Sequence, residues 1–419
     1  MQFRHTYYII FLSFIFSQSF YPGYFNGISL GGNIEYSDSR SMGIGNTFVT
    51  TGTTSSVISR NPSKLSYLAE NIQIDFQINM LMNFERRSID ILDGWGEFLA
   101  ETDYVFNQHQ YNYNAIGILF GHQFKNFNLG FGLSYKPLSS FDYTYEEEIR
   151  GDEDFDDGVL GIRDPIIGYH LYSSRGNLDI LSGGLGISKQ LSDFSNPLAI
   201  GISFNKIISS NISSSIDVDT LYNSINPYNY DNMSNVLPTH YSHKAKGEFF
   251  ITASLEIPLS QELLLICSYE SDAASDSDDI SNFEISESTG LPWLLEFTED
   301  EQLTLIDLGI NYLKPERTTL GLIHSSSYDN SMILAFEIIQ ETYNNYINNS
   351  IEEYKLGFEY STDLGMPIRA GITYKEALFS PLDPVTTMTL GSGKKFNNLN
   401  IDFALNYNNT KYRYLDIFP

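Results

Sequence analysis

The chain has 419 residues, of which 14% are aromatic and only 18% are charged, and its formal net charge is -28. This acidity excludes a nucleic-acid partner, because phosphate binding needs a basic face that releases counterions. The 29 Tyr and 29 Phe exclude a disordered acidic chain, which would be poor in aromatic residues. The single cysteine, Cys267, excludes an internal disulfide framework and a multi-cysteine metal site.

The N-terminus predicts a secretory signal peptide. Arg4 and His5 precede an apolar run from Tyr7 to Phe16, and Ser17-Gln18-Ser19 supplies the small-x-small cleavage site. A membrane anchor is the alternative, but it needs about twenty apolar residues, roughly twice the length of this run. We therefore expect residues 1–19 to be removed and the mature chain to lie outside the cytoplasm.

Strict alternation of apolar and polar residues from residue 71 onward predicts β-strands. In 71–80 (NIQIDFQINM) every even-numbered residue is apolar and every odd-numbered residue is polar, which indicates a strand with one wet face and one apolar face. The pattern recurs in the segments 126–135, 198–205, 247–257, 354–361, 368–374 and 399–407.

The residue types on the two faces favour a membrane barrel over a secreted β-sandwich or solenoid, whose strands also alternate. The polar faces carry mostly Gly, Asn and Ser rather than charged residues, as expected inside a barrel. Many apolar faces end in tyrosine, which is typical of an aromatic girdle at a membrane interface. These tyrosines are Tyr135, Tyr269, Tyr312, Tyr360, Tyr374 and Tyr407.

Short and long connections alternate along the chain. Short turns are expected at 125–126, 192–197, 258–261, 327–330, 361–367 and 394–398. Between them lie long polar segments at 82–113, 138–179, 208–246 and 271–302, followed by shorter ones at 342–352 and 376–384. Outer-membrane barrels have short periplasmic turns and long external loops. The pattern therefore predicts an all-β, transmembrane antiparallel β-barrel of about fourteen strands over residues 71–419.

This strand count depends on Pro315 and on the C-terminus. Residues 303–325 must form one strand with a kink at Lys314-Pro315, because a turn there would reverse the direction of every later strand. Residues 411–418 must then form the closing strand. A hairpin at Pro315 is the alternative, and it would change the strand count.

A second pattern precedes the first strand. Between residues 39 and 65 the chain is rich in small residues and nearly free of charge. Gly43 and Gly45 allow a close approach of two backbones, and Pro62 fixes a bend. We expect residues 20–70 to form a hatch in the barrel lumen. The alternative is that Asn61-Pro62 is an ordinary turn before the first strand.

Two motifs in this segment resemble the N-terminal signature of the FadL/TodX-like outer-membrane proteins and, most nearly, of the related PorV/PorQ-type proteins. They are Ser39-Arg40-Ser41-Met42-Gly43-Ile44-Gly45 and Asn61-Pro62-Ser63-Lys64-Leu65. LGFEYSTDLGMPIRAGITY (356–374) and MTLGSGKKFNNLNIDFALNY (388–407) are similar to C-terminal strand pairs of that family. The resemblance implies a barrel in the outer membrane of a Gram-negative-type bacterium, with a hatch formed around Arg40, Met42, Gly43, Gly45, Asn61, Pro62, Lys64 and Leu65.

The resemblance implies one of two functions. The first is passive uptake of hydrophobic small molecules of the fatty-acid or hydrocarbon type. The alternative is an accessory barrel that scaffolds or shuttles secreted protein cargo, as in type IX secretion, without solute transport. Lys64 stands where transport-type members often carry glycine, which favours the second. Expected partners are outer-membrane lipid and either a hydrophobic small molecule or protein cargo, with the protein a monomer or a subunit of a secretion complex.

One group of charged residues and several weaker motifs complete the candidate sites. Lys355, Glu359 and Arg369 lie on the polar faces of neighbouring predicted strands, so we expect an ion network in the lumen, with a ligand site as the alternative. The acidic segments 146–157 and 272–287 are expected to be solvated charge runs, since Asp157 and Arg163 replace the glycine and glutamate of an EF-hand loop; calcium binding is the alternative.

The remaining motifs do not predict chemistry. His240 and His243 have no further ligand at a known motif spacing. Residues 391–395 (GSGKK) have Met388 where a phosphate-binding loop needs its first glycine. No Gly-x-Ser-x-Gly elbow occurs, and no pair of carboxylates is distinguishable from the acidic loops. We therefore expect no enzyme, no metal site and no cofactor.

Overall fold

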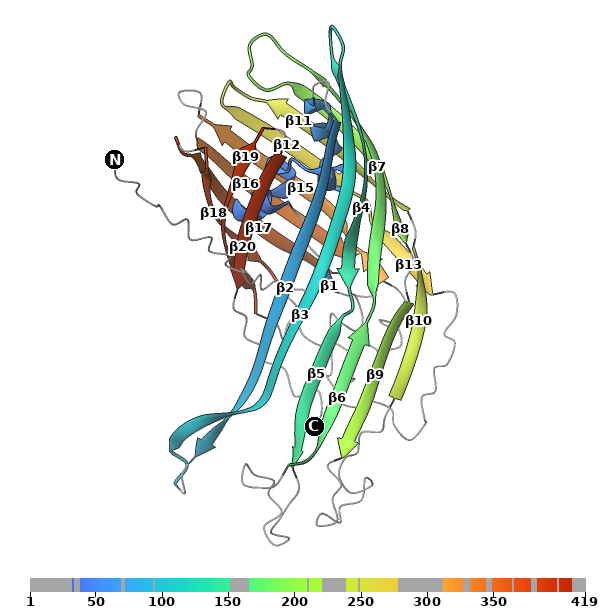
Figure 1. Ribbon diagram of the computed structural model, residues 1–419, viewed down its shortest axis with the longest axis vertical. Coiled ribbons are helices and arrows are strands. Elements are labelled where there is room, and N and C mark those ends of the chain that lie inside the picture. Colours follow the sequence, from blue (N-terminus) through green and yellow to red (C-terminus); the bar gives the residue numbers. More distant parts are fainter. Residues whose placement is uncertain are drawn as a thin grey trace, which may run out of the picture.

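The computed structural model describes residues 32–33, 38–68, 72–92, 95–150, 166–208, 211–220, 239–247, 249–277, 312–326, 332–343, 349–363, 365–377, 383–397 and 399–408. These residues form one large antiparallel sheet, a smaller sheet and a segment of short helices (Figure 1). Among the described residues, no helix is both long enough and apolar enough to cross a membrane.

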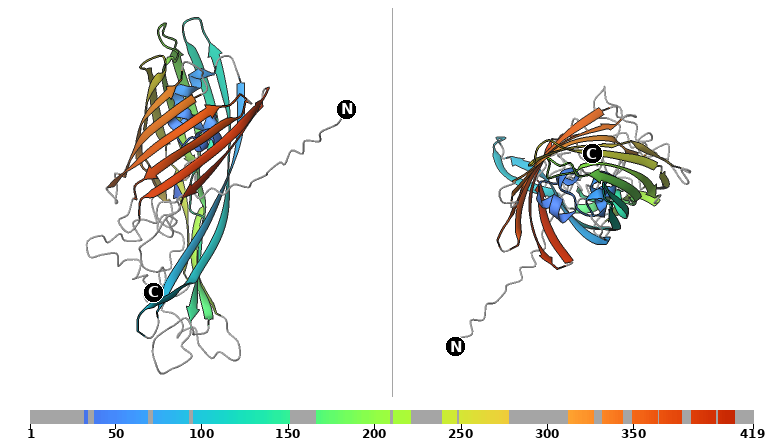
Figure 2. Two further views of the ribbon diagram at one scale, coloured as in Figure 1. Left: turned by 90° about the vertical axis from the view of Figure 1, so that its left-hand side faces the viewer. Right: turned by 90° about the horizontal axis from the view of Figure 1, so that it is seen from above.

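The large sheet contains thirteen strands in a continuous antiparallel path, and a two-residue strand, β1 (Gly32–Asn33), pairs beside β4. The path runs through β2 (Ile72–Leu92), β3 (Phe98–Gln123), β4 (Asn128–Ser140), β7 (Asn177–Lys189), β8 (Leu198–Ile208), β11 (Phe249–Pro258), β12 (Leu263–Glu270), β15 (Glu316–Ser325), β16 (Met332–Tyr343), β17 (Asn349–Ser361), β18 (Pro367–Lys375), β19 (Val385–Phe396) and β20 (Leu399–Asn408). This sheet curls around the short helices (Figure 2). The all-β antiparallel architecture is thus confirmed, while the expected closing strand at 411–418 lies outside the described residues.

The smaller sheet extends the large one at a single end, beside the tip of the β2–β3 hairpin (Figure 1). Its strands, in order, are β14 (Tyr312–Lys314), β13 (Ala273–Ser277), β10 (Thr239–Gly247), β9 (Asn211–Thr220), β6 (Ile166–Arg175) and β5 (Tyr143–Arg150). Much of the polar sequence expected as loops is therefore strand, and the segment 82–113 is mostly the β2–β3 hairpin. Most of these strands lie within long segments rich in polar and acidic residues, a composition that favours loops.

Pro315 separates β14 from β15, which follow one another in the same direction, and residues 303–311 of the predicted strand lie outside the described residues. Before it, Lys314 of β14 pairs with Ala273 of β13, and after it, Arg317 of β15 pairs with Glu270 of β12. The chain keeps its direction through the proline, so the hairpin alternative is wrong. A proline is accommodated at this break because it has no backbone N–H to contribute to the ladder.

Apolar side chains cover the outer face of the large sheet, and small polar ones cover the inner face. On β8, Ile202 and Phe204 are exposed on the outer face, whereas Ser203 and Asn205 are fully buried on the inner face. A β-sandwich would bury its apolar face instead, so this alternative is excluded. The predicted tyrosines whose side chains are described are all exposed on the outer face: Tyr135, Tyr269, Tyr360, Tyr374 and Tyr407.

Candidate binding region between the inner segment and the sheet

Residues 38–68, which we call the inner segment, form short helices inside the curl of the large sheet (Figure 2). They are α2 (Ser39–Gly43), α3 (Phe48–Thr51), η2 (Ser55–Ser59) and η3 (Pro62–Tyr67). Side-chain hydroxyl groups donate hydrogen bonds to backbone carbonyls within the segment; for example, Thr51 Oγ1 donates to Thr47 O at 2.7 Å. Asp38 caps α2 by accepting from Ser41 N at 2.7 Å. Pro62 is the first residue of η3, so Asn61-Pro62 starts a helix rather than an ordinary turn.

Glycines on the inner face of the sheet lie where the inner segment touches the wall. A Cβ atom at Gly201 of β8 would stand 2.2 Å from the backbone nitrogen of Ser63, and one at Gly391 of β19 would stand 2.9 Å from the Cα atom of Gly43. The backbone of the inner segment therefore packs directly against the sheet. The inner-face glycines that face the backbone of the inner segment are Gly121, Gly130, Gly186, Gly201, Gly357, Gly371 and Gly391, and those that face its side chains are Gly117, Gly132, Gly184 and Gly321.

Carboxylates on well-separated strands bind backbone and hydroxyl donors of the inner segment. Glu337 of β16 accepts from Thr50 N at 2.7 Å and from Thr50 Oγ1 at 3.0 Å. Asp75 of β2 accepts from Ser55 N and from Ser55 Oγ, both at 2.8 Å. Hydrogen bonds to a charged acceptor are the stronger kind, so these two carboxylates hold the middle of the inner segment against the sheet.

Arg40 joins two of the three residues expected to form a lumen ion network. Its Nη2 and Nε atoms donate to the two carboxylate oxygens of Glu359 at 2.7 and 2.9 Å. Arg369 Nε donates to Glu359 Oε2 at 2.6 Å. Lys355 is buried on the same inner face but pairs with Glu353 at 3.2 Å. Glu359 and Arg369 thus lie together, and Lys355 belongs to a separate pair.

The second motif of the inner segment converges on one buried carboxylate of β11. Asn61 Nδ2 donates to Glu256 Oε1 at 2.7 Å, and Ser63 Oγ donates to the same oxygen at 3.1 Å. Lys64 Nζ lies 3.8 Å from that oxygen. The Tyr67 hydroxyl donates to Glu256 Oε2. Lys64 is therefore part of an anchoring network rather than a freely solvated charge.

The apolar residues of the two motifs are also buried. Met42 is shielded in α2, and Leu65 is fully buried in η3. Leu65 belongs to an apolar cluster with Phe48, Val57, Ile58 and Leu119. This cluster joins the inner segment to the inner face of β3, so the segment has a small core of its own.

A small cavity with cationic walls lies at the end of η2. Its charged lining consists of Arg60, Lys136, Lys314, Arg317 and Glu270. The inner segment supplies Arg60, and four strands, β4, β12, β14 and β15, supply the others. The cavity has a volume of about 20 Å³, which suffices for one water-sized occupant.

One wall of this cavity is apolar and faces inward. Leu138, Ile180 and Phe250 line it. They belong to an inward-facing apolar cluster, whose buried members are Phe141, Leu178, Ile180, Ile207, Phe250 and Ala273. Leu264 and Ile266 of the inner face pack against Val49 of the inner segment, whereas this cluster lines the cavity, which makes it the candidate surface for an apolar ligand.

The wall of the sheet is interrupted beside this cluster. β3 and β4 pair only as far as Tyr135, although β4 continues to pair with β7 as far as Ser140. A register shift falls between Pro137 and Ser139 of β4. The edge of β4 that β3 leaves is used by β1, which pairs with Ser139 and Ser140.

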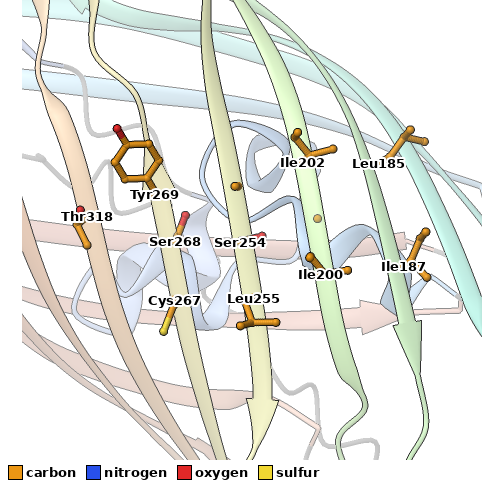
Figure 3. A pocket seen from close by; sticks show the side chains of 12 residues that line it. Leu185, Ile187, Ile200, Ile202, Ser254, Leu255, Cys267, Ser268, Tyr269 and Thr318 are labelled. Atoms are coloured by element: carbon orange, nitrogen blue, oxygen red, sulfur yellow. The ribbon is translucent and has the colours of Figure 1, made fainter.

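A larger groove of about 630 Å³ lies on the outer face, away from the inner segment (Figure 3). Its lining comes from β7, β8, β11, β12 and β15, and includes Ile187, Ile200, Leu255 and Cys267. Because these side chains point outward, the groove is part of the apolar outer surface and is separate from the cationic cavity.

Sequence reasoning found the residues of the inner segment but missed most of their partners on the wall. Glu256, Glu270, Glu337 and Lys136 were not selected, although each shares the inner face of its strand with small polar residues. The sequence pattern that could have identified them is a charged residue on the same face of a predicted strand as its small polar residues. The tertiary structure was needed to show which of these residues meet.

The weaker motifs gain no chemical role from the structure. His240 and His243 lie in β10, and residues 391–395 lie in β19. No group of three or more His, Cys, Asp or Glu residues in the described part of the chain is placed to hold a metal ion. Much of the two acidic segments, 151–157 and 278–287, lies outside the described residues.

Comparisons with known proteins identify the fold. No family profile and no curated protein matches the sequence. Among solved structures, the chain is similar to a Pseudomonas aeruginosa FadL homologue, with a TM-score of 0.53 and 14% identity over 91% of each chain. The Pseudomonas putida toluene transporter TodX matches over 93% of each chain, with a TM-score of 0.47 and 14% identity. The described chain therefore has a FadL-like β-barrel fold.

Proposed function

We propose that this protein is an outer-membrane channel for the passive uptake of hydrophobic small molecules. The observation that carries the proposal is the reversed polarity of the large sheet. Large apolar side chains cover its outer face, and the small polar face surrounds the inner segment. Such a sheet is stable where hydrocarbon surrounds it and water or polar groups fill its interior. The similarity to a FadL homologue supports the same assignment.

The interior contains an apolar cluster, buried and closely packed in this structure, that would receive the solute when it opens. The inward-facing cluster around Ile180 and Phe250 lies between the extended strands and the inner segment. The interruption between β3 and β4 begins at Tyr135, near the same level of the wall. We infer that a solute enters from the end that carries the smaller sheet and is received by this cluster.

In this proposal, residues 20–70 act as the hatch, with the contacts of the inner segment keeping the lumen closed. Leaving the cluster requires either a shift of the inner segment or passage through the interruption in the wall. The solute class that fits best is a compact apolar molecule or an acyl chain, because the cluster is formed by aliphatic and aromatic side chains.

Uptake by whole cells tests this proposal. A host without its own channel for hydrophobic compounds would express the full-length chain, and entry of radiolabelled dodecanoate and toluene would be measured. We expect uptake above that of the empty vector. Heat-modifiable mobility of the outer-membrane fraction would verify that a folded barrel is present. Background uptake by cells that contain the folded barrel would contradict the proposal.

A matched pair of variants makes the test specific. Phe250 is buried in the inward-facing cluster, whereas its neighbour Phe249 is 63% exposed on the outer face. We expect Phe250→Ser to lower uptake at least tenfold while the folded barrel persists, and Phe249→Ser to retain uptake. Equal uptake by the two variants would contradict a role of the inward-facing cluster in the passage of the solute.

The secretion scaffold of the PorV/PorQ type stays a prediction. Its specific support is the network around Glu256, which includes Lys64 and holds the inner segment against the wall. Photo-crosslinking groups placed in the β2–β3 hairpin, for example at exposed Trp95, would capture secreted protein if this function is correct. Uptake without crosslinked protein would favour the channel.

A further inference from the structure

The cavity at the end of η2 is enclosed by more positive than negative charges. Glu270 is the single carboxylate that lines it, against the four cations Arg60, Lys136, Lys314 and Arg317. Glu270 lies 2.9 Å from Arg60 Nε, 3.3 Å from Lys314 Nζ and 3.8 Å from Arg317 Nη1. Glu270 therefore already forms ion pairs with three of the four cations.

Glu341, the carboxylate that pairs with Arg317, does not balance the remaining positive charge. Glu341 pairs with Arg317, but it also lies 3.3 Å from Lys375 Nζ. Among the described residues, the lining of the cavity itself contains four cations and one carboxylate. Positive charge therefore exceeds negative charge in the lining of a cavity that excludes most water.

Lys136 is the cation with the weakest compensation. Its side chain projects from the inner face of β4, and the residue is only 4% exposed. Among the described residues, no carboxylate lies within ion-pair distance of its ammonium group, and its recorded contact is the ring of Phe48 at 5.8 Å. Burying an ammonium group without a counter-charge is costly, so a negative partner in the adjoining cavity would stabilise the fold.

We propose that one small inorganic anion of the halide class, chloride, binds in this cavity beside Lys136. The volume of about 20 Å³ fits a single water-sized occupant and excludes an acyl chain. Arg60 and Lys136 face the anion, while Glu270 is held by its three cations. The anion would fasten the end of η2 to β4 and β15. This inference concerns the folded state and is independent of transport.

Bromide substitution locates the proposed ion directly. Crystals of the full-length protein in detergent would be grown with bromide in place of chloride, and anomalous differences would be collected at the bromine edge. We expect one anomalous peak in the cavity, near Lys136 Nζ. A cavity that contains only water and gives no anomalous peak would overturn the proposal.

Stability measurements supply a second test with a control. At constant ionic strength, we expect the unfolding midpoint of the wild type to be about 2–4 °C higher in chloride than in gluconate. Lys136→Met should lose this difference. Lys206→Met removes an exposed lysine from the outer face of β8 and should keep it. An equal chloride effect in both variants would contradict the assignment.

The same cavity could instead receive the carboxylate head of an amphiphilic solute. Dodecanoate added to the bromide crystals distinguishes these sources. We expect the bromide peak to persist, because the small cavity has no space for the attached chain. Loss of the peak, with carboxylate density beside Lys136, would assign the cavity to the solute and overturn the inorganic-anion proposal.

Discussion

Arg40 and Glu359 form a two-point ion pair across 319 residues of sequence, with donor–acceptor distances of 2.7 and 2.9 Å. Arg40 lies in the first helix of the inner segment, and Glu359 lies on the inner face of β17. Glu359 also accepts from Arg369. Glu359 therefore anchors the inner segment to β17 and, together with Asp402, pairs with Arg369 of β18.

Removal of this carboxylate charge should loosen the inner segment. We expect Glu359→Gln to lower the free energy of unfolding by about 3 kcal/mol, because two arginines lose their common charged partner in a buried site. Urea unfolding of the refolded protein in lipid vesicles would measure the change. The control, Glu352→Gln, alters the outward side of the same strand and should change stability by less than about 1 kcal/mol. Equal losses in the two variants would contradict the anchoring role.

Replacing an inner-face glycine that contacts the inner segment by a larger residue should displace that segment. A Cβ at Gly201 would stand 2.2 Å from Ser63 N, so we expect Gly201→Val to cost about 1–3 kcal/mol and to expose residues 38–68 to protease. At Gly183 the corresponding contact is a flexible end of Leu133 at 3.3 Å. Gly183→Val should therefore resemble the wild type in limited proteolysis. An inner segment that stays protected in Gly201→Val would show that the contact can relax.

The destabilisation caused by a charge introduced on the outer face should depend on how deeply that position lies in the membrane. Ile202 lies in the middle of β8, whereas Leu259 lies in the turn after β11. We expect Ile202→Arg to destabilise the barrel by about 2–4 kcal/mol and Leu259→Arg by about 0–1 kcal/mol, since the cost of a lipid-facing charge falls toward the interface. Unfolding from lipid vesicles gives both values. Similar costs at the two positions would contradict a membrane-spanning orientation of β8.

Linking the inner segment to the wall should decide whether it moves during uptake. Ser63 N donates to Ser254 Oγ at 2.8 Å, so these residues are neighbours across the interface. In a Cys267→Ser background, we expect Ser63→Cys with Ser254→Cys to lose at least tenfold uptake when oxidised and to recover it when reduced. Cys267→Ser alone should not respond. Unchanged uptake in the oxidised double variant would assign the exit to the interruption between β3 and β4.

The apolar alternation predicted the large sheet because a strand between hydrocarbon and a polar interior must repeat every two residues. The alternation also located the short turns between strands. It required the chain to keep its direction through Pro315, because successive strands of the sheet are antiparallel. Most strands of the smaller sheet were missed because they lie within long segments rich in polar and acidic residues, which favoured loops. The glycines of β8 and β19 could be assigned to a crowded interior, but their contact partners could not be identified.

The sequence by itself determined the fold class and the polarity of the two faces, and it predicted that residues 20–70 form the hatch. These properties are local, since each depends on residue type and on spacing within one segment. Only the tertiary structure decided that Lys355 lies apart from Glu359, that Asn61 and Lys64 meet Glu256, and that Arg60, Lys136 and Lys314 enclose one cavity. Such meetings depend on the register of strands far apart in the chain and on how the inner segment lies against them, and no local pattern specifies these relationships.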